Sequence, residues 1–213
     1  MSPVRHAATP RSALCRIGHL PDPLAWPPVE LTGGGRFDDP QREFRVLYAG
    51  GRRACFFETL APFRPSVEAL AALRGVTGTD EMLPQAVVPA DWYQKRAVAR
   101  LRLLPGQRWL DLRATQTHET LRTELASILL ALGVRDLDLS EVLSRERRLT
   151  QAISRWAYDR GHGGIVYRSR FAAATSLWAI FEGARLEPAG VAEPILPDDP
   201  DLVAAARVFG LAL

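Results

Sequence analysis

Three polar residues in the first third of the chain have the types and the spacing to bind a phosphate-bearing ligand. Arg36 directly follows the run Gly33-Gly34-Gly35, and a guanidinium beside a glycine turn can hold a phosphate through two parallel hydrogen bonds. Tyr48 ends an expected strand, where its ring can stack on a flat heterocycle. Glu58 lies in a strongly apolar run, so its carboxylate needs a partner or a shifted pKa. Taken alone, these residues favour a simpler interpretation, a structural Arg36–Glu58 salt bridge beside a core tyrosine.

Hydrophobic periodicity and turn residues predict the elements that must position these side chains. The expected strands cover residues 14–18, 44–49, 97–104, 109–112, 164–167 and 177–181. The expected helices cover residues 52–60, 67–73, 117–132, 145–160 and 202–208. This order of elements is typical of an α+β domain in which a small mixed sheet is flanked by helices.

Some details of these elements are also expected from the sequence. Strand 109–112 follows the turn Pro105-Gly106 and is expected to form a hairpin with strand 97–104. Helix 67–73 is expected to begin at the cap Ser66 and to end at Gly75. The last helix is expected to be loosely attached, because it follows a proline-rich stretch.

The composition is that of a packed globular domain rather than of a disordered chain. Hydrophobic residues make up 47% of the 213 residues and charged residues 24%, which allows one domain with a sizeable core. A formal net charge of +3 does not predict a nucleic-acid partner. No stretch approaches the roughly 18 apolar residues of a membrane span, and the first residues include no apolar stretch long enough for the signal peptide of a secreted protein, so none is expected. We therefore expect a soluble, cytoplasmic protein.

The remaining reactive residue types favour structural roles. The two cysteines are too isolated for a disulfide framework or a zinc site, and Cys55 is expected to be a buried, inert thiol. His118 lacks further ligands at helical spacing, so no metal is expected. His162 lies among glycines and is expected to be a solvated turn histidine. A solvated helix face is expected for four arginines, Arg145, Arg147, Arg148 and Arg155.

The order of the motifs resembles the RES-domain family. The matching segments are Gly35-Arg36-Phe37, Leu47-Tyr48-Ala49, Phe57-Glu58-Thr59 and Gly164-Ile165-Val166-Tyr167-Arg168-Ser169. The resemblance spans residues 16–182 and places a RES domain over residues 13–186. A flexible segment is then expected over residues 1–12, and a proline-rich C-terminal extension with a short helix over residues 187–213.

The resemblance implies a fold, an activity and a partner. RES domains are similar to ADP-ribosyltransferases in fold and typically serve as toxins of toxin–antitoxin pairs. They consume NAD⁺, or in some members move ADP-ribose to a protein. Their antitoxins carry an Xre-like helix-turn-helix domain and cover the active site. The resemblance therefore implies NAD⁺ as substrate and an antitoxin as partner, and it leaves a homo-oligomer open.

The resemblance also implies roles for the matching residues. Cleavage of the nicotinamide–ribose bond passes through an oxocarbenium-like transition state, which the carboxylate of Glu58 would stabilise. Arg36 would hold the pyrophosphate, Tyr48 would pack at the nicotinamide ribose, and Ser169 would donate a hydrogen bond nearby. Nicotinamide needs no general acid to leave, because it already carries a positive charge in NAD⁺. Further substrate contacts are expected from Gly35, Phe37 and Arg52, the last near a helix N-terminus.

Several departures from the family pattern keep other functions open. Phe37-Asp38 stands where many members have Trp-Asn, and Asp38-Asp39 adds negative charge near the expected pyrophosphate. Arg168 precedes Ser169 where a small residue or proline is common. The alternatives are a mono-ADP-ribosyltransferase, a catalytically silent interaction module with the RES fold, and a ribonuclease-type toxin suggested by arginine richness.

Overall fold

The protein forms a mixed α+β domain, which the computed structural model describes for residues 4–77, 85–172 and 174–213. In the main sheet the strands follow the order β1 (His6–Ala7), β6 (Trp109–Asp111), β7 (Gly164–Arg168), β8 (Ser176–Phe181), β3 (Val46–Gly50), β2 (Leu14–His19), β5 (Arg96–Leu103) and β10 (Glu193–Pro194), and β9 (Leu186–Pro188) also pairs with β5. Strands β6 and β7 are parallel, and the other pairs of this sheet are antiparallel. Strands β4 (Ala86–Val87) and β11 (Leu211–Ala212) form a small parallel pair.

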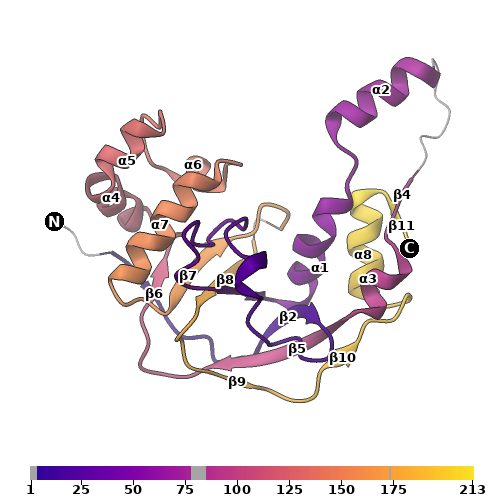
Figure 1. Cartoon of the computed structure of the whole chain (residues 1–213), viewed down its shortest axis with the longest axis horizontal. Helices are drawn as coiled ribbons and strands as arrows, with labels where there is room; N and C mark the ends of the chain where they lie inside the picture. Colours follow the sequence, from indigo (N-terminus) through magenta and orange to yellow (C-terminus); the bar gives the residue numbers. More distant parts are fainter. Residues whose placement is uncertain (1–3, 78–84, 173) are drawn as a thin grey trace.

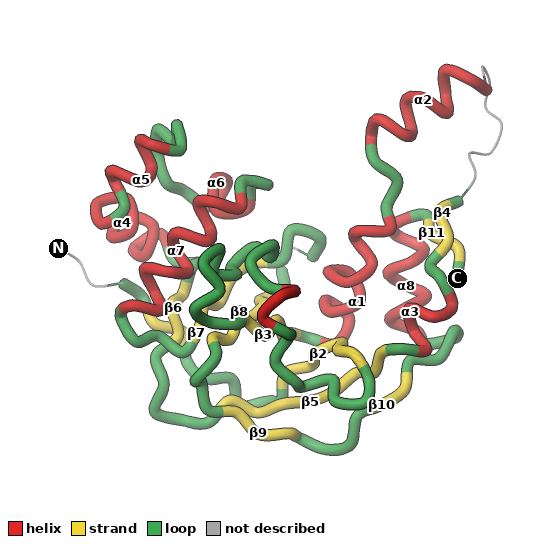
Figure 2. Tube along the Cα trace, in the orientation of Figure 1, coloured by secondary structure: helices red, strands yellow, loops and turns green. Residues whose placement is uncertain are grey.

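The helices form two groups above the sheet (Figures 1 and 2). One group contains α4 (Thr115–Glu124), α5 (Ala126–Ala131), α6 (Leu139–Leu143) and α7 (Arg147–Asp159). The other contains α1 (Arg52–Leu60), α3 (Ala90–Gln94) and α8 (Pro200–Phe209). Helix α2 (Val67–Thr77) extends away from the body in Figure 1, and two 3₁₀ turns cover Val29–Leu31 and Ala61–Phe63. The segment with the glycine run lies between the two groups.

Alternation along the central strands sends side chains to the two faces of the sheet. In β3, Val46 and Tyr48 contact the cluster under α4–α7, whereas Leu47 and Ala49 belong to a cluster on the opposite face. Successive side chains of a strand point to opposite faces, and in β3 both faces are covered. Tyr167 in β7 lies on the same face as Tyr48. The sheet thus directs two tyrosines toward the helices that flank the candidate site.

The expected fold class is confirmed, and so are most of the expected elements. Helix α1 covers the expected residues 52–60, and the Ser66 hydroxyl caps α2 through the amide of Ala69 at 3.0 Å. Helix α2 continues past Gly75 to Thr77, so the expected stop is wrong. The long helix expected over residues 117–132 is divided into α4 and α5 at Leu125, which leaves helical geometry with a ψ of 16°.

Two expectations about tertiary contacts are wrong. Strand β6 does not pair with β5, because β9 pairs with β5 in this region while β6 lies between β1 and β7. All three β6 residues are buried, which fits an interior strand better than a hairpin arm. Helix α8 is not loosely attached, since Leu202, Ala205 and Ala206 are buried in the same cluster as residues of α1.

None of the helices in the described residues is long and apolar enough to cross a lipid bilayer.

Candidate active site

The centre of the candidate site is a hydrogen bond between two residues that are far apart in sequence. Glu58 lies in α1, and Ser169 directly follows β7. The Ser169 hydroxyl donates to Glu58 Oε1 at 2.6 Å and accepts from the amides of Phe171 at 3.1 Å and Ala172 at 3.0 Å. Since two backbone donors occupy the acceptor side of this oxygen, its own proton is directed at Glu58. Ser169 therefore fixes the orientation of the carboxylate.

Burial raises the pKa of Glu58, although its environment also contains opposing effects. The Ser169 hydrogen bond and the positive charges of Arg36 and Arg170 lower the pKa, but burial is the largest influence. The side chain is half-buried rather than enclosed. A carboxylate that is partly desolvated and still accessible interacts strongly with positive charge on a ligand.

Arg36 faces the same region without forming the expected salt bridge. Its Nη2 donates to the carbonyl oxygens of Val142 and, at 3.4 Å, of Ser144, both at the end of α6. Its Nε is buried and makes no hydrogen bond in the described structure. Burial lowers the pKa of Arg36, followed by repulsion from Arg170. Because no carboxylate lies within salt-bridge distance among the described residues, the simple Arg36–Glu58 salt bridge is ruled out.

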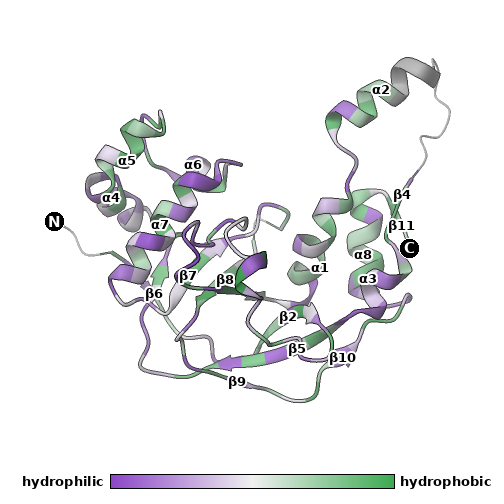
Figure 3. Cartoon of the chain, in the orientation of Figure 1, coloured by the Kyte–Doolittle hydropathy of each residue, from purple (hydrophilic) through white to green (hydrophobic). Residues whose placement is uncertain are grey.

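One face of α7 holds the loop that carries Arg36. The side chains of this face donate to loop carbonyl oxygens: Thr150 to Arg36 at 2.6 Å, Gln151 to Gly33 at 3.1 Å and to Gly35 at 3.0 Å, Ser154 to Phe37 at 2.6 Å, and Arg147 to Gly34. The spacing of these donors places them on one helix face. Figure 3 shows the hydrophilic residues that α7 carries. Glycines have no side chains, so α7 binds this part of the loop through its carbonyl oxygens.

The arginines of α7 are therefore not simply solvated. Arg147 binds the loop, and Arg155 pairs with Asp39 at 3.3 Å and with Glu43. Arg148 does match the expectation, because it is exposed and pairs with Glu146 of its own helix start. The sequence pattern of α7 could not predict that this helix binds the glycine loop, because the acceptors are backbone atoms more than a hundred residues away.

Tyr48 and Asp38 close the loop from the other side. The Tyr48 hydroxyl donates to Asp38 Oδ1 at 2.8 Å and accepts from the amide of Phe37 at 2.9 Å. Asp38 Oδ2 accepts from the amides of Gly33 at 3.1 Å and Gly35 at 2.7 Å. A Cβ on Gly35 would lie 2.5 Å from Asp38 Oδ1, so a larger residue here would displace the Asp38 carboxylate from its hydrogen bonds. The Tyr48 hydroxyl is thus a structural link, and the residue as a whole is half-buried.

The two neighbouring aspartates are directed inward rather than toward a ligand. Asp38 is 8% exposed and Asp39 is 2% exposed. Asp39 accepts from the amide of Glu43 at 2.8 Å in addition to its pairing with Arg155. The two carboxylates that the sequence placed near a pyrophosphate therefore bind groups of the protein itself.

Two expected substrate contacts are not supported by the geometry. Phe37 is fully buried, and its ring packs 4.6 Å from that of Tyr167, so its side chain belongs to the core. Arg52 is paired with Asp199 at 2.5 Å and with Asp201 at 2.9 Å, at the start of α8. These hydrogen bonds raise the pKa of Arg52 and neutralise its charge, so it offers no open anion site.

Two residues that the sequence analysis did not select lie at the site. Burial raises the pKa of Tyr167, and the charges of Glu58 and Arg36 act on it as well. The charge of Arg170 also acts on Glu58 and Arg36, and its Nη1 lies 3.5 Å from the Ser144 carbonyl oxygen. Alternation from Ile165 could have placed Tyr167 on the helix-covered face, but no local signal distinguished Arg170 from other arginines.

The other reactive residue types have structural surroundings. His162 is buried and not solvated as expected, with Nδ1 3.0 Å from Ala157 O and Nε2 3.3 Å from His6 Nε2. Burial lowers the pKa of His162 to about 4. Cys55 is a free, buried thiol that donates to Cys15 O at 3.1 Å, and burial raises its pKa to about 12, as an inert thiol requires. The described residues contain no group of three potential metal ligands.

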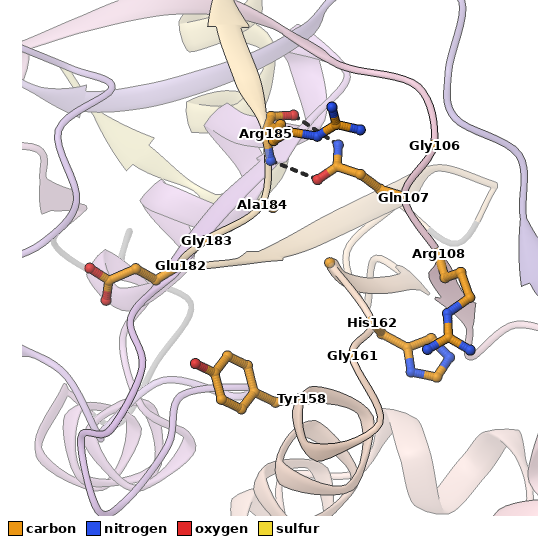
Figure 4. A pocket seen from close by; sticks show the side chains of 11 residues that line it. Gly106, Gln107, Arg108, Tyr158, Gly161, His162, Glu182, Gly183, Ala184 and Arg185 are labelled. Carbon is orange, nitrogen blue, oxygen red and sulfur yellow. Dashed lines mark hydrogen bonds between the residues drawn. The ribbon is translucent and has the colours of Figure 1, made fainter.

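A hollow of about 560 Å³ lies away from Glu58, at the opposite ends of β7 and β8 (Figure 4). Gln107 on its wall exchanges two hydrogen bonds with the backbone of Arg185, and Glu182 is paired with Arg45. The polar groups here are engaged with the protein itself. The hollow therefore differs from the surroundings of Glu58 and Arg36, where a half-buried arginine has no carboxylate partner among the described residues.

The fold and the site define an α+β domain in which a half-buried carboxylate faces an arginine with no carboxylate partner in the described part of the chain. The chain belongs to the RES-domain family, because the family model described as the RES domain matches residues 13–203. This match extends beyond residue 186 into α8. No protein of curated function matched the sequence.

A solved structure has a similar fold. It is a chain in the crystal structure of the M. tuberculosis MbcT–MbcA toxin–antitoxin complex, with a TM-score of 0.50 and 14% sequence identity. The similarity covers 89% of this chain and 87% of that chain. At this identity the likeness establishes the shared fold.

Proposed function

We propose that this protein cleaves the glycosidic bond between nicotinamide and ribose in NAD⁺. The observation that carries the proposal is the Glu58 carboxylate, which Ser169 orients at 2.6 Å in a partly desolvated position beside Arg36. Membership of the RES-domain family supports the same reaction.

The proposed mechanism assigns separate tasks to the four residues. Glu58 stabilises the positive charge that develops on the anomeric carbon as the bond to nicotinamide breaks. Ser169 is a positioning residue, because its proton is committed to Glu58. Arg36 binds the pyrophosphate with the part of its guanidinium that the carbonyl oxygens at the end of α6 do not use. Tyr48 fixes the Arg36 loop through its hydroxyl and would pack its ring at the nicotinamide ribose.

We also propose that the protein is the toxin of a toxin–antitoxin pair. The family and the fold shared with a chain of a toxin–antitoxin complex support this assignment. The partner would be an antitoxin with an Xre-like helix-turn-helix domain that covers the Glu58 site. Co-expression of the neighbouring reading frame, followed by co-purification, tests the partner, and a protein that purifies alone from cells tolerating it would contradict this part.

The fate of the ADP-ribose identifies the reaction class. Purified protein is incubated with NAD⁺ labelled in the adenine, with and without phosphate and cell extract, and the products are separated. Free ADP-ribose indicates hydrolysis, a phosphorylated ADP-ribose indicates phosphorolysis, and label on protein indicates mono-ADP-ribosyl transfer. Intact NAD⁺ under all conditions, with a folded sample, would contradict the proposal and favour a catalytically silent interaction module.

A further inference from the structure

A second arginine approaches the Glu58 site from a different element than Arg36. Arg36 comes from the glycine loop, and Arg170 comes from the turn after β7. A terminal nitrogen of each lies near the same acceptor, the Ser144 carbonyl oxygen, at 3.4 Å for Arg36 and 3.5 Å for Arg170. A guanidinium has five donors, and a contact of 3.5 Å is a weak hydrogen bond. Arg170 is thus near the site without being fixed by a strong partner.

The charges of these two arginines are less compensated than those of the arginines that pair with carboxylates elsewhere in the fold. Arg52, Arg113 and Arg155 each pair with at least one carboxylate. Neither Arg36 nor Arg170 has a carboxylate within ion-pair distance among the described residues. Glu58 acts on Arg36 over a longer distance. Two cations and one distant carboxylate leave a net positive charge, which attracts an anion with two charged groups.

The turn that carries Arg170 is well defined by its neighbours. The Ser169 hydroxyl accepts hydrogen bonds from two consecutive backbone amides, those of Phe171 and Ala172. The Arg170 guanidinium lies 5.6 Å from the centre of the Phe171 ring. The same serine therefore orients Glu58 and fixes the backbone at Arg170. This coupling sets the backbone from which the Arg170 side chain extends relative to the carboxylate.

We propose that Arg170 is a specificity-determining residue that binds a diphosphate together with Arg36, one guanidinium for each phosphate group. The inference rests on the proposed function, because it assigns the pyrophosphate of NAD⁺ to two side chains instead of one. A monophosphate engages one of the two guanidiniums. The site therefore selects nucleotides with a diphosphate over those with a monophosphate.

Calorimetric titration with ADP and with AMP tests the selection directly. The full chain is compared with Arg170→Gln, Arg170→Lys and the control Arg102→Gln, which removes an exposed arginine from β5. A charge-assisted contact at an exposed side chain corresponds to about a tenfold change in Kd. We expect Arg170→Gln to weaken ADP binding about tenfold and AMP binding less than threefold. Arg170→Lys should retain part of the selectivity, and Arg102→Gln should retain all of it.

The outcomes separate this inference from the proposed function. If wild-type protein binds ADP and Arg170→Gln changes ADP and AMP binding by the same factor, or changes neither, Arg170 does not bind the second phosphate. If wild-type protein neither binds ADP nor releases nicotinamide from NAD⁺, the proposed function itself fails. Circular dichroism of each variant confirms that a loss of binding does not reflect a loss of folding.

Discussion

Arg36 and Arg52 both look like anion-binding residues in the sequence, but their surroundings differ. Arg52 lies at the start of α1 and is paired with Asp199 and Asp201 of α8. Arg36 lies in the glycine loop, where uncharged carbonyl oxygens at the end of α6 hold its guanidinium. One arginine joins two helices of the fold, and the other keeps its charge available.

This difference shows how charge compensation separates a structural arginine from a ligand-binding one. Carboxylates that pair with a guanidinium cancel its charge and occupy its donors in the same geometry that a phosphate would use. Carbonyl oxygens orient the group while leaving the positive charge in place. The distinction depends on residues distant in the chain, so it is invisible in the local sequence around either arginine.

The largest expected effect is on catalysis in a paired substitution of the two arginines. Arg36→Gln should lower kcat/KM for NAD⁺ about 100-fold, the size of a lost charge-assisted contact to a phosphate. Arg52→Gln should lower it less than threefold. Steady-state nicotinamide release measures both. Equal losses in the two variants would contradict the comparison.

The stability effects should fall in the opposite order. Arg52→Gln leaves Asp199, which is 6% exposed at its side chain, without its cation. We expect a loss of about 2 kcal/mol in the free energy of unfolding, reduced from the value for a fully buried pair because Arg52 is partly exposed. Arg36→Gln should cost less than about 1 kcal/mol. Urea unfolding of both variants tests this order, and a larger loss for Arg36→Gln would reverse it.

Tyr48→Phe sharpens the account of the Arg36 loop. The substitution keeps the ring but removes the hydroxyl that joins the Phe37 amide to Asp38. The Phe37 amide and Asp38 Oδ1 then lose this hydrogen-bond partner, which should cost about 1–2 kcal/mol of stability. Activity should fall about tenfold through the misplaced loop. Full activity in Tyr48→Phe would show that only the ring of Tyr48 matters. Arg148→Ala, which changes an exposed residue of α7, is the control.

The smallest expected effect is a pH-dependent gain in stability. Burial raises the pKa of Glu58 above its ordinary value of 4.5, so the folded state disfavours the ionised carboxylate. Its unfavourable contribution is absent below pH 4.5 and grows as the pH rises through the folded-state pKa. Glu58→Gln should therefore be more stable than wild type at pH 7, with a higher Tm.

Two thermal scans test this prediction. The difference between Glu58→Gln and wild type should shrink as the pH is lowered to 4. A gain that is the same at both pH values would mean that ionisation of Glu58 does not cause it.

The sequence predicted the elements better than their partners, for a physical reason. Residue composition and turn signals located α1 and the central strands, because both kinds of signal are local in the chain. Pairing of β6 with β7 and packing of α8 on α1 depend on distant segments, and both were missed. At the site, the resemblance selected Glu58 and Ser169, which the structure joins at 2.6 Å. No local pattern could reveal that α7 binds the carbonyls of the loop, since those acceptors have no side-chain signature.

The central claim is that Glu58 enables cleavage of NAD⁺, and nicotinamide release tests it most directly. Wild type and Glu58→Gln are purified under the same conditions, and nicotinamide is measured by chromatography at pH 7. Gln can still accept the Ser169 hydrogen bond, so the variant removes the charge while preserving the local geometry. We predict release by wild type and at least a roughly 1,000-fold lower rate for folded Glu58→Gln. Equal rates in the two proteins would contradict the account.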